Sequence, residues 1–167
     1  MVANLNASRD ALIAALEGVS EDVARRSPGS GKWSVLECVE HVAVVEAYLL
    51  HEIVNARRSE APMINIVREA VILERGLDRT RRVTAPEAAT PRNRFATLSG
   101  ALEHFQAKRA ETIEFVENYT DDPRAMLAQH PLIGTANTYE ILLIMAIHPH
   151  RHAQQIREIL ETLKTST

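Results

Sequence analysis

Two histidines near the end of the chain are spaced so that both could bind one metal ion. His148 and His152 are four residues apart, and residues at that spacing share one face of a helix because each residue advances about 100°. Ile141, Met145 and Ile159 fall on the same face, so the pair is expected to point into an apolar interior. An i, i+4 histidine pair suits two ligands of a single divalent ion.

His41 is expected to point into the same interior from a second helix, because Val45 and Tyr48 flank it at helical spacing. A buried imidazole that lacks a hydrogen-bonding partner costs about 1–3 kcal/mol. One divalent cation would satisfy all three rings, provided that the fold brings the two helices together at that level. Otherwise each ring is an ordinary hydrogen-bonded core histidine, and the sequence alone leaves both interpretations open.

Pro149 is unusual because it directly follows His148 inside the predicted helix. A proline there cannot donate to the carbonyl of Met145, and its ring pushes that carbonyl away. The helix is therefore expected to bend or loosen beside His148, either as a tolerated kink or as a widened pocket. A strand would also place alternate histidines of residues 148–152 on one face, but the helical pattern continues on both sides.

Three further residues lie close to the predicted site. Gln155 falls on the same face as His148 and could orient a ligand or a bound water. Glu37 lies one turn before His41 and could support that ligand, although a capping role at its helix start is the stronger interpretation. Cys38 lies near the same face and is expected to be a small buried residue rather than a fourth ligand.

The other four histidines are not assigned to the site. His51 lies near a helix end, and His130 precedes a proline in a loop. His104 shares a helix face with charged residues, and His150 points away from the predicted site, so both are expected to be exposed.

Four long helices must position these residues. Apolar spacing predicts them over Leu5–Arg26, Ser34–Arg57, Leu98–Asn118 and Thr138–Lys164. Between the second and the third, a shorter helix is predicted over Pro62–Arg75 and a loop over Gly76–Arg94. The sequence therefore predicts an all-α fold, a four-helix bundle with a long crossover between helices two and three.

Cap signals support two of these helix starts. Ser34 and Glu37 have the spacing of a capping box, in which each side chain accepts a hydrogen bond from the other residue's backbone. Asn137 and Glu140 have a similar pattern before the last helix. These short-range signals place the start of each histidine-bearing helix within a residue or two.

The composition is that of a soluble globular protein. The 167 residues predict a single domain, 1–167, with 46% hydrophobic and 25% charged residues and only 4% aromatic residues. A net charge of -3 gives no reason to expect nucleic acid or a membrane as partner. The single cysteine, the absence of a signal-peptide pattern and the lack of a long apolar run favour a cytoplasmic location.

The chain resembles the DinB-like (DinB/YfiT) superfamily of four-helix bundles with a three-histidine metal site. The matching features are Trp33 followed by His41, Phe105 to Arg109, His130 to Gly134, and His148 to Ile156. The resemblance covers most of the chain, and it implies that His41, His148 and His152 are the metal ligands. The proline after the first histidine of the late pair departs from the family pattern.

Two kinds of function are considered, and the resemblance implies the first of them. The first is a metal-dependent enzyme for a small-molecule substrate, because relatives include S-transferases that activate low-molecular-weight thiols and others assigned as hydrolases. Zn²⁺ or Ni²⁺ would be the ion, since imidazole suits both, and three ligands leave a position open. The second is a non-catalytic metal-binding or stress-response bundle. A homodimer is expected to be compatible with either.

The long connection is locally basic. This is either a solvated loop or a rim that steers an anionic substrate to the metal. Its arginines are Arg75, Arg79, Arg81, Arg82, Arg92 and Arg94.

Overall fold

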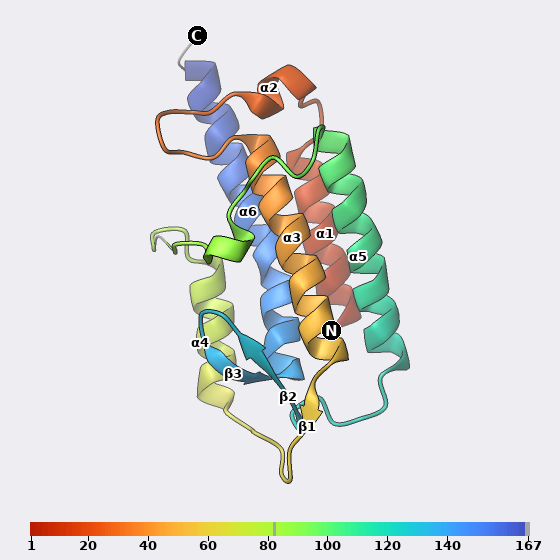
Figure 1. Ribbon diagram of the computed structural model, residues 1–167. Coiled ribbons are helices and arrows are strands. Elements are labelled where there is room, and N and C mark those ends of the chain that lie inside the picture. Colours follow the sequence, from red (N-terminus) through yellow and green to blue (C-terminus); the bar gives the residue numbers. More distant parts are fainter. Residues whose placement is uncertain (82, 166–167) are drawn as a thin grey trace.

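The computed structural model describes residues 1–81 and 83–165. Four long helices lie side by side as a bundle (Figure 1): α1 (Val2–Ala15), α3 (Val35–Val54), α5 (Leu98–Asn118) and α6 (Thr138–Thr165). Both α1 and α3 pack against α5 and α6, so α1 and α3 lie across the bundle from each other. The predicted four-helix bundle with a long connection before its third long helix is confirmed.

The prediction of one helix over Leu5–Arg26 is wrong, because this segment forms two helices. The first helix ends at Ala15, and α2 covers Glu21–Arg25. Between them Gly18 has φ +73°, a backbone conformation that favours glycine. The Ser20 side chain then accepts a hydrogen bond from the backbone of α2 at 3.3 Å and caps this short helix. The apolar spacing continues through the break and concealed it.

The predicted capping box at the start of α3 is confirmed. The Glu37 backbone N–H donates to Ser34 Oγ at 3.2 Å, and the Ser34 N–H donates to the Glu37 carboxylate at 2.7 Å. The helix ends at Val54, whereas Arg57, the predicted last residue, already belongs to a strand. The start of the helix that carries His41 was therefore predicted more accurately than its end.

A small antiparallel sheet, which the sequence did not predict, lies at one end of the bundle (Figure 1). Its strands are β1 (Arg57–Arg58), β2 (Met126–His130) and β3 (Gly134–Asn137), with β2 in the middle. His130, expected in a loop, is buried at the end of β2. The sheet joins the segments that follow α3 and precede α6, and it lies at the start of α6.

The long connection contains α4 (Ile66–Leu77) and the short 3-10 helix η1 (Glu87–Ala89). The predicted helix over Pro62–Arg75 is thus present but shifted toward the C-terminus. Helix α4 packs along α6 (Figure 1). A Cβ atom on Gly76 would lie only 2.0 Å from Cδ1 of Ile147, so any larger residue there would force the Ile147 side chain or α4 to shift.

The core consists of two clusters of buried side chains stacked along the bundle. One lies around Phe105 and includes residues of α1, α2, α3, α5 and α6; the other lies near the sheet and includes Leu49 and Met145. Within residues 1–81 and 83–165, no helix combines the length and the apolar character of a membrane span.

Candidate metal centre

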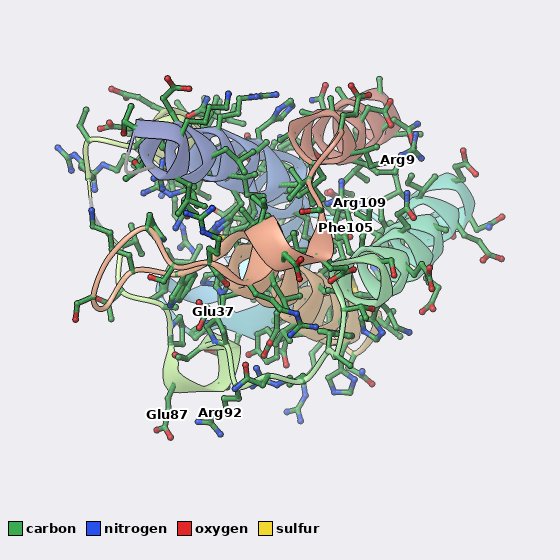
Figure 2. The ribbon with its side chains drawn as sticks, turned by 90° about the horizontal axis from the view of Figure 1, so that it is seen from above. Arg9, Glu37, Glu87, Arg92, Phe105 and Arg109 are labelled. Atoms are coloured by element: carbon green, nitrogen blue, oxygen red, sulfur yellow. The ribbon has the colours of Figure 1, made fainter. Side chains whose placement is uncertain are left out.

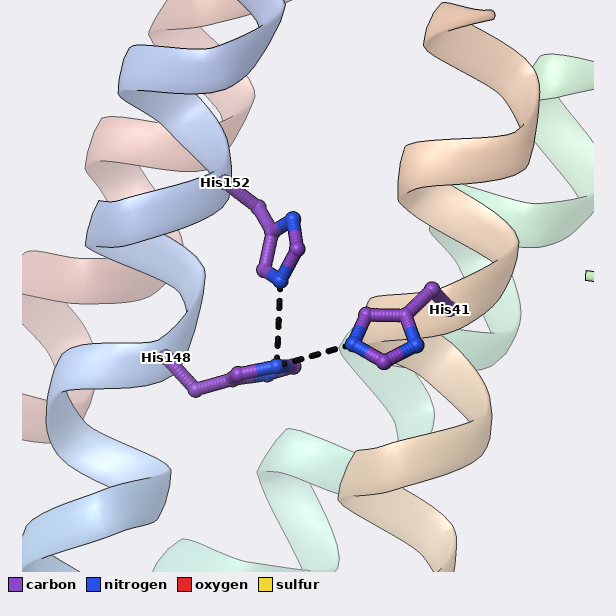
Figure 3. Close-up of side chains that lie close together, drawn as sticks. All are labelled: His41, His148 and His152. Atoms are coloured by element: carbon purple, nitrogen blue, oxygen red, sulfur yellow. Dashed lines mark hydrogen bonds between the residues drawn. The ribbon is translucent and has the colours of Figure 1, made fainter. Parts of the chain in front are cut away.

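The structure brings His41, His148 and His152 together at one point between α3 and α6 (Figure 3). Nε2 of His148 lies 3.1 Å from Nε2 of His41 and 3.1 Å from Nε2 of His152. The sequence predicted the direction of these side chains from helical phase alone. It could not establish that α3 and α6 are neighbours, which the packing now provides. We call these residues the three-histidine cluster.

The cluster is largely enclosed. His41 and His152 are each 6% exposed, and His148 is half-buried. The ring of Trp33 lies 5.0 Å from the His41 ring and 6.5 Å from the His152 ring, measured between centroids. Trp33 therefore forms a wall of the site, a role that its position in the sequence did not reveal.

The protonation of His41 is fixed by a hydrogen bond from its other ring nitrogen. Nδ1 lies 2.8 Å from the carbonyl oxygen of Ala89, which can only accept, so Nδ1 must carry the proton. Nε2 of this neutral ring then presents a lone pair to the cluster. Because Ala89 belongs to η1, the long connection holds one of the three imidazoles in a ligand-competent form.

Glu40 attaches this connection to α3 and is a functional residue that sequence reasoning missed. Its carboxylate, 1% exposed, accepts hydrogen bonds from Arg92 N at 2.6 Å and Arg94 N at 3.2 Å. The Arg94 guanidinium adds an ion pair at 2.8 Å. The only sequence signal was an acidic residue next to His41 on a helix with an apolar interior face.

The donor set fits a cation better than it fits hydrogen bonds. His148 Nε2 makes two short contacts, and His41 Nε2 can only accept, so one proton cannot satisfy both contacts with linear hydrogen bonds. Three lone pairs can instead share one ion. Two nitrogens bound tetrahedrally to Zn²⁺ at about 2.05 Å are separated by about 3.3 Å, close to the observed 3.1 Å.

All three imidazoles favour the neutral form that binds metals. Burial lowers the pKa of His41, opposed by its hydrogen bond to Ala89. Burial also lowers the pKa of His148 and His152 well below the usual 6.5, and the neighbouring rings of the cluster lower both further. Protons therefore compete weakly with a metal at neutral pH.

The three further residues that the sequence placed near the site have different roles. Glu37 closes the capping box, as its stronger interpretation held. Cys38 is fully buried, and burial raises the pKa of its thiol to about 12, so it remains a thiol. Gln155 lies near His152 and opposes the lowering of the His152 pKa by burial. Its Oε1 accepts a hydrogen bond from Arg79 at 3.3 Å.

Two of the unassigned histidines are less exposed than expected. His104 is half-buried, with its ring 5.3 Å from the Phe95 ring, and His150 is half-buried on α6. Both expectations of exposure are therefore wrong, although neither residue joins the cluster. His51, in the last turn of α3, is exposed.

The basic connection is partly neutralised by carboxylates. This pairing reduces the positive field that the arginines would offer an anionic substrate and favours the first of the two interpretations, a solvated connection; Arg82 lies outside the described residues. The pairs are Arg79 with Glu158, Arg92 with Glu87, and Arg94 with Glu40.

A four-helix bundle with a three-histidine cluster between two of its helices defines the class of this protein. The chain belongs to the DinB superfamily, whose sequence model matches residues 4–156. The resemblance inferred from the motifs is thereby confirmed. Among curated proteins, no sequence matches the chain.

Two solved structures share the fold. YfiT from Bacillus subtilis is 16% identical, with a TM-score of 0.61 over 98% of this chain and 85% of that chain. It is described as a probable metal-dependent hydrolase with an unusual four-helix bundle topology. TT2238, a four-helix bundle protein, is 20% identical, with a TM-score of 0.55 over 93% of this chain and 94% of that chain. At these identities the likeness concerns the fold.

Proposed function

We propose that the chain is a metal-dependent enzyme acting on a small molecule, with His41, His148 and His152 as ligands of one divalent transition ion. Zn²⁺ and Ni²⁺ are the proposed ions because neutral imidazole binds both well. The proposed reaction is either hydrolysis or the transfer of a low-molecular-weight thiol to an electrophile. The description of YfiT as a metal-dependent hydrolase supports the first of these reactions.

The observation that carries this proposal is the convergence of three Nε2 atoms, with 3.1 Å between His148 and each of its two partners. Three protein ligands leave a coordination position for a reactant, which is the arrangement of catalytic rather than structural zinc. A bound divalent ion would supply Lewis acidity and would lower the pKa of a water or a thiol.

The charge of a bound dication would favour an anionic reactant. The three imidazoles are neutral ligands, and of the arginines near His148 and His152, Arg79 is paired with Glu158 and Arg109 with Glu46, so these two add little net positive charge. A dication held by neutral ligands keeps its full charge, so a thiolate or carboxylate would be favoured beside it.

Residues of the chain would hold such a reactant in place. Trp33 covers His41 and His152 and shields that side of the site from water. The Gln155 amide is held by Arg79, and it leaves two N–H donors that could orient a reactant.

A non-catalytic metal-binding or stress-response protein is the second candidate, and the low exposure of His41 and His152, 6% each, favours it because an enclosed cluster offers a reactant little access. Two surface cavities, of about 350 and 420 Å³, lie away from the cluster. One is lined by the turn after α1 and the end of α6, the other by α3 and α5. Neither includes a cluster histidine, so these cavities bear on neither candidate.

The two candidates are separated by an activity screen of the metal-free, Zn²⁺-loaded and Ni²⁺-loaded protein. Electrophiles are offered with and without a thiol such as bacillithiol or mycothiol, and esters and amides are offered alone. The proposal predicts metal-dependent turnover that His41→Ala abolishes and His150→Ala retains. Thiol-dependent turnover would identify an S-transferase, and thiol-independent turnover a hydrolase. Stoichiometric metal without turnover on any substrate would support the non-catalytic candidate.

A further inference from the structure

The carbonyl of Met145 lacks its helical hydrogen bond because the residue four positions later is Pro149, which has no N–H. Met145 is buried, and a buried carbonyl without a partner is costly. The guanidinium of Arg109 supplies that partner, since its Nη2 donates to Met145 O at 2.9 Å. An arginine on α5 thus compensates for a proline in the middle of α6.

Arg109 is fully buried and uses all five of its N–H donors. Nε and Nη2 donate to the Glu46 carboxylate at 2.8 Å each, Nη1 donates to Leu5 O and Ser8 Oγ, and Nη2 also donates to Met145 O. These acceptors belong to α3, α1 and α6, so one side chain joins the four long helices. Viewed along the bundle, Arg109 lies in its interior beside Phe105, whereas Glu87 and Arg92 lie at its edge (Figure 2).

The contact lies next to the three-histidine cluster. His148 falls within the turn from Met145 to Pro149, so the backbone of that turn carries its Cα–Cβ bond. His152 follows one turn later, in the part of α6 beyond the proline, where the helical hydrogen bonds are no longer interrupted.

We propose that Arg109 is a positioning residue of the metal centre. By holding the Met145 carbonyl at the break made by Pro149, it sets the direction of His148 relative to His41 and His152. This inference rests on the proposed function, because positioning matters only if the cluster binds a metal. Ligands must be held within about 0.5 Å of their working geometry, so a small change in this turn is expected to weaken binding.

The first test is Pro149→Ala, which returns an N–H donor to the Met145 carbonyl and closes the helical turn. Alanine is a far better helix residue than proline, so the melting temperature of the metal-free protein is expected to stay equal or rise. The Co²⁺ dissociation constant is nevertheless expected to rise about tenfold, with a shift in the visible Co²⁺ absorption bands. Pro62→Ala, at an exposed proline before α4, is the matched control and should leave all three readouts unchanged.

The second test is Arg109→Lys, which keeps the positive charge beside Glu46 but cannot reach every acceptor at once. It is expected to lower the melting temperature and to weaken Co²⁺ binding. In the Pro149→Ala background the Met145 carbonyl already has a partner, so the loss in melting temperature from Arg109→Lys should be clearly smaller. Such coupling between two helices is measured without any metal. If Arg109→Lys does not fold, the Co²⁺ dissociation constant and absorption spectrum of Pro149→Ala decide whether the inference holds.

The outcomes separate this inference from the proposed function. A wild-type chain that binds no Co²⁺ would refute the metal centre and the positioning role with it. Wild-type binding together with an unchanged dissociation constant and spectrum in Pro149→Ala would refute the positioning role alone. Equal losses in melting temperature from Arg109→Lys in both backgrounds would also refute it, because they would show that Arg109 does not act through the Met145 carbonyl.

Discussion

Replacing Glu40 with glutamine tests whether the long connection is fastened to the bundle through one buried carboxylate. Oε1 accepts from Arg92 N and the Arg94 guanidinium, and Oε2 accepts from Arg94 N. Glutamine keeps one acceptor oxygen and places an NH₂ group where the other was. At least one N–H then faces a donor, and the ion pair with Arg94 is lost.

The expected cost of Glu40→Gln is about 2–4 kcal/mol. A hydrogen bond to a charged group contributes about 1.5–3 kcal/mol, and an N–H left unpaired costs about 1–3 kcal/mol. Breaking a fully buried ion pair costs about 3–5 kcal/mol, but the Arg94 side chain is 31% exposed and regains hydration. For a chain of this size the melting temperature should fall by about 5–15 °C.

The same variant should weaken metal binding. Glu40 holds the segment whose Ala89 carbonyl fixes the proton of His41, and loss of such an outer partner typically costs 10–100-fold in metal affinity. Urea or thermal unfolding and a Zn²⁺ titration measure the two effects. Glu87→Gln is the control because Glu87, 92% exposed, pairs with Arg92 only at the surface and should change stability by less than about 0.5 kcal/mol. Equal melting temperatures for the two variants would refute the reasoning.

Three further predictions concern pH, thiol reactivity and helix packing. The pKa values of the cluster histidines are lowered below 6.5 in the folded protein, so below that pH the unfolded chain binds more protons than the folded one. The stability of the metal-free protein should therefore fall as the pH drops through 6.5. A melting temperature that stays constant between pH 7.5 and 5 would contradict this. Cys38, with its pKa raised to about 12, should resist a thiol reagent at pH 8 until the protein is unfolded, and rapid modification of native protein would contradict its burial. Gly76→Ala should destabilise the protein by about 1–3 kcal/mol in urea, because its Cβ would overlap the Ile147 side chain, whereas unchanged stability would show that this side chain or α4 shifts without cost.

The features that sequence predicted well depend on residues close together in the chain. The capping pair Ser34 and Glu37 spans four residues, as does the pair Asn137 and Glu140, whose reciprocal hydrogen bonds are 2.8 and 3.1 Å. The inward direction of His152 followed from helical phase, which is also local. Such signals are decided by one helical turn and need no knowledge of the fold.

The features that it missed depend on contacts between distant segments. The two-residue strand β1 pairs with β2, and Leu127 of β2 lies opposite Arg57. A strand of two residues is too short to show a pattern that predicts this pairing. Arg109 belonged to a motif of the family resemblance, but only the packing of the four helices shows that its side chain is buried and bonds to three other helices. Glu40 was missed for the same reason, since its partners are more than fifty residues away.

Zn²⁺ binding by His152→Ala and His150→Ala tests the central claim most directly. The two histidines are neighbours on α6, but only His152 belongs to the three-histidine cluster. The wild-type chain and His150→Ala should bind about one Zn²⁺ per chain, and at a hundred times the dissociation constant the melting temperature should rise by about 5–11 °C. His152→Ala should lose more than about 100-fold in affinity, beyond the effect of an outer partner. No binding by the wild type, or equal losses in both variants, would contradict a metal centre at these residues.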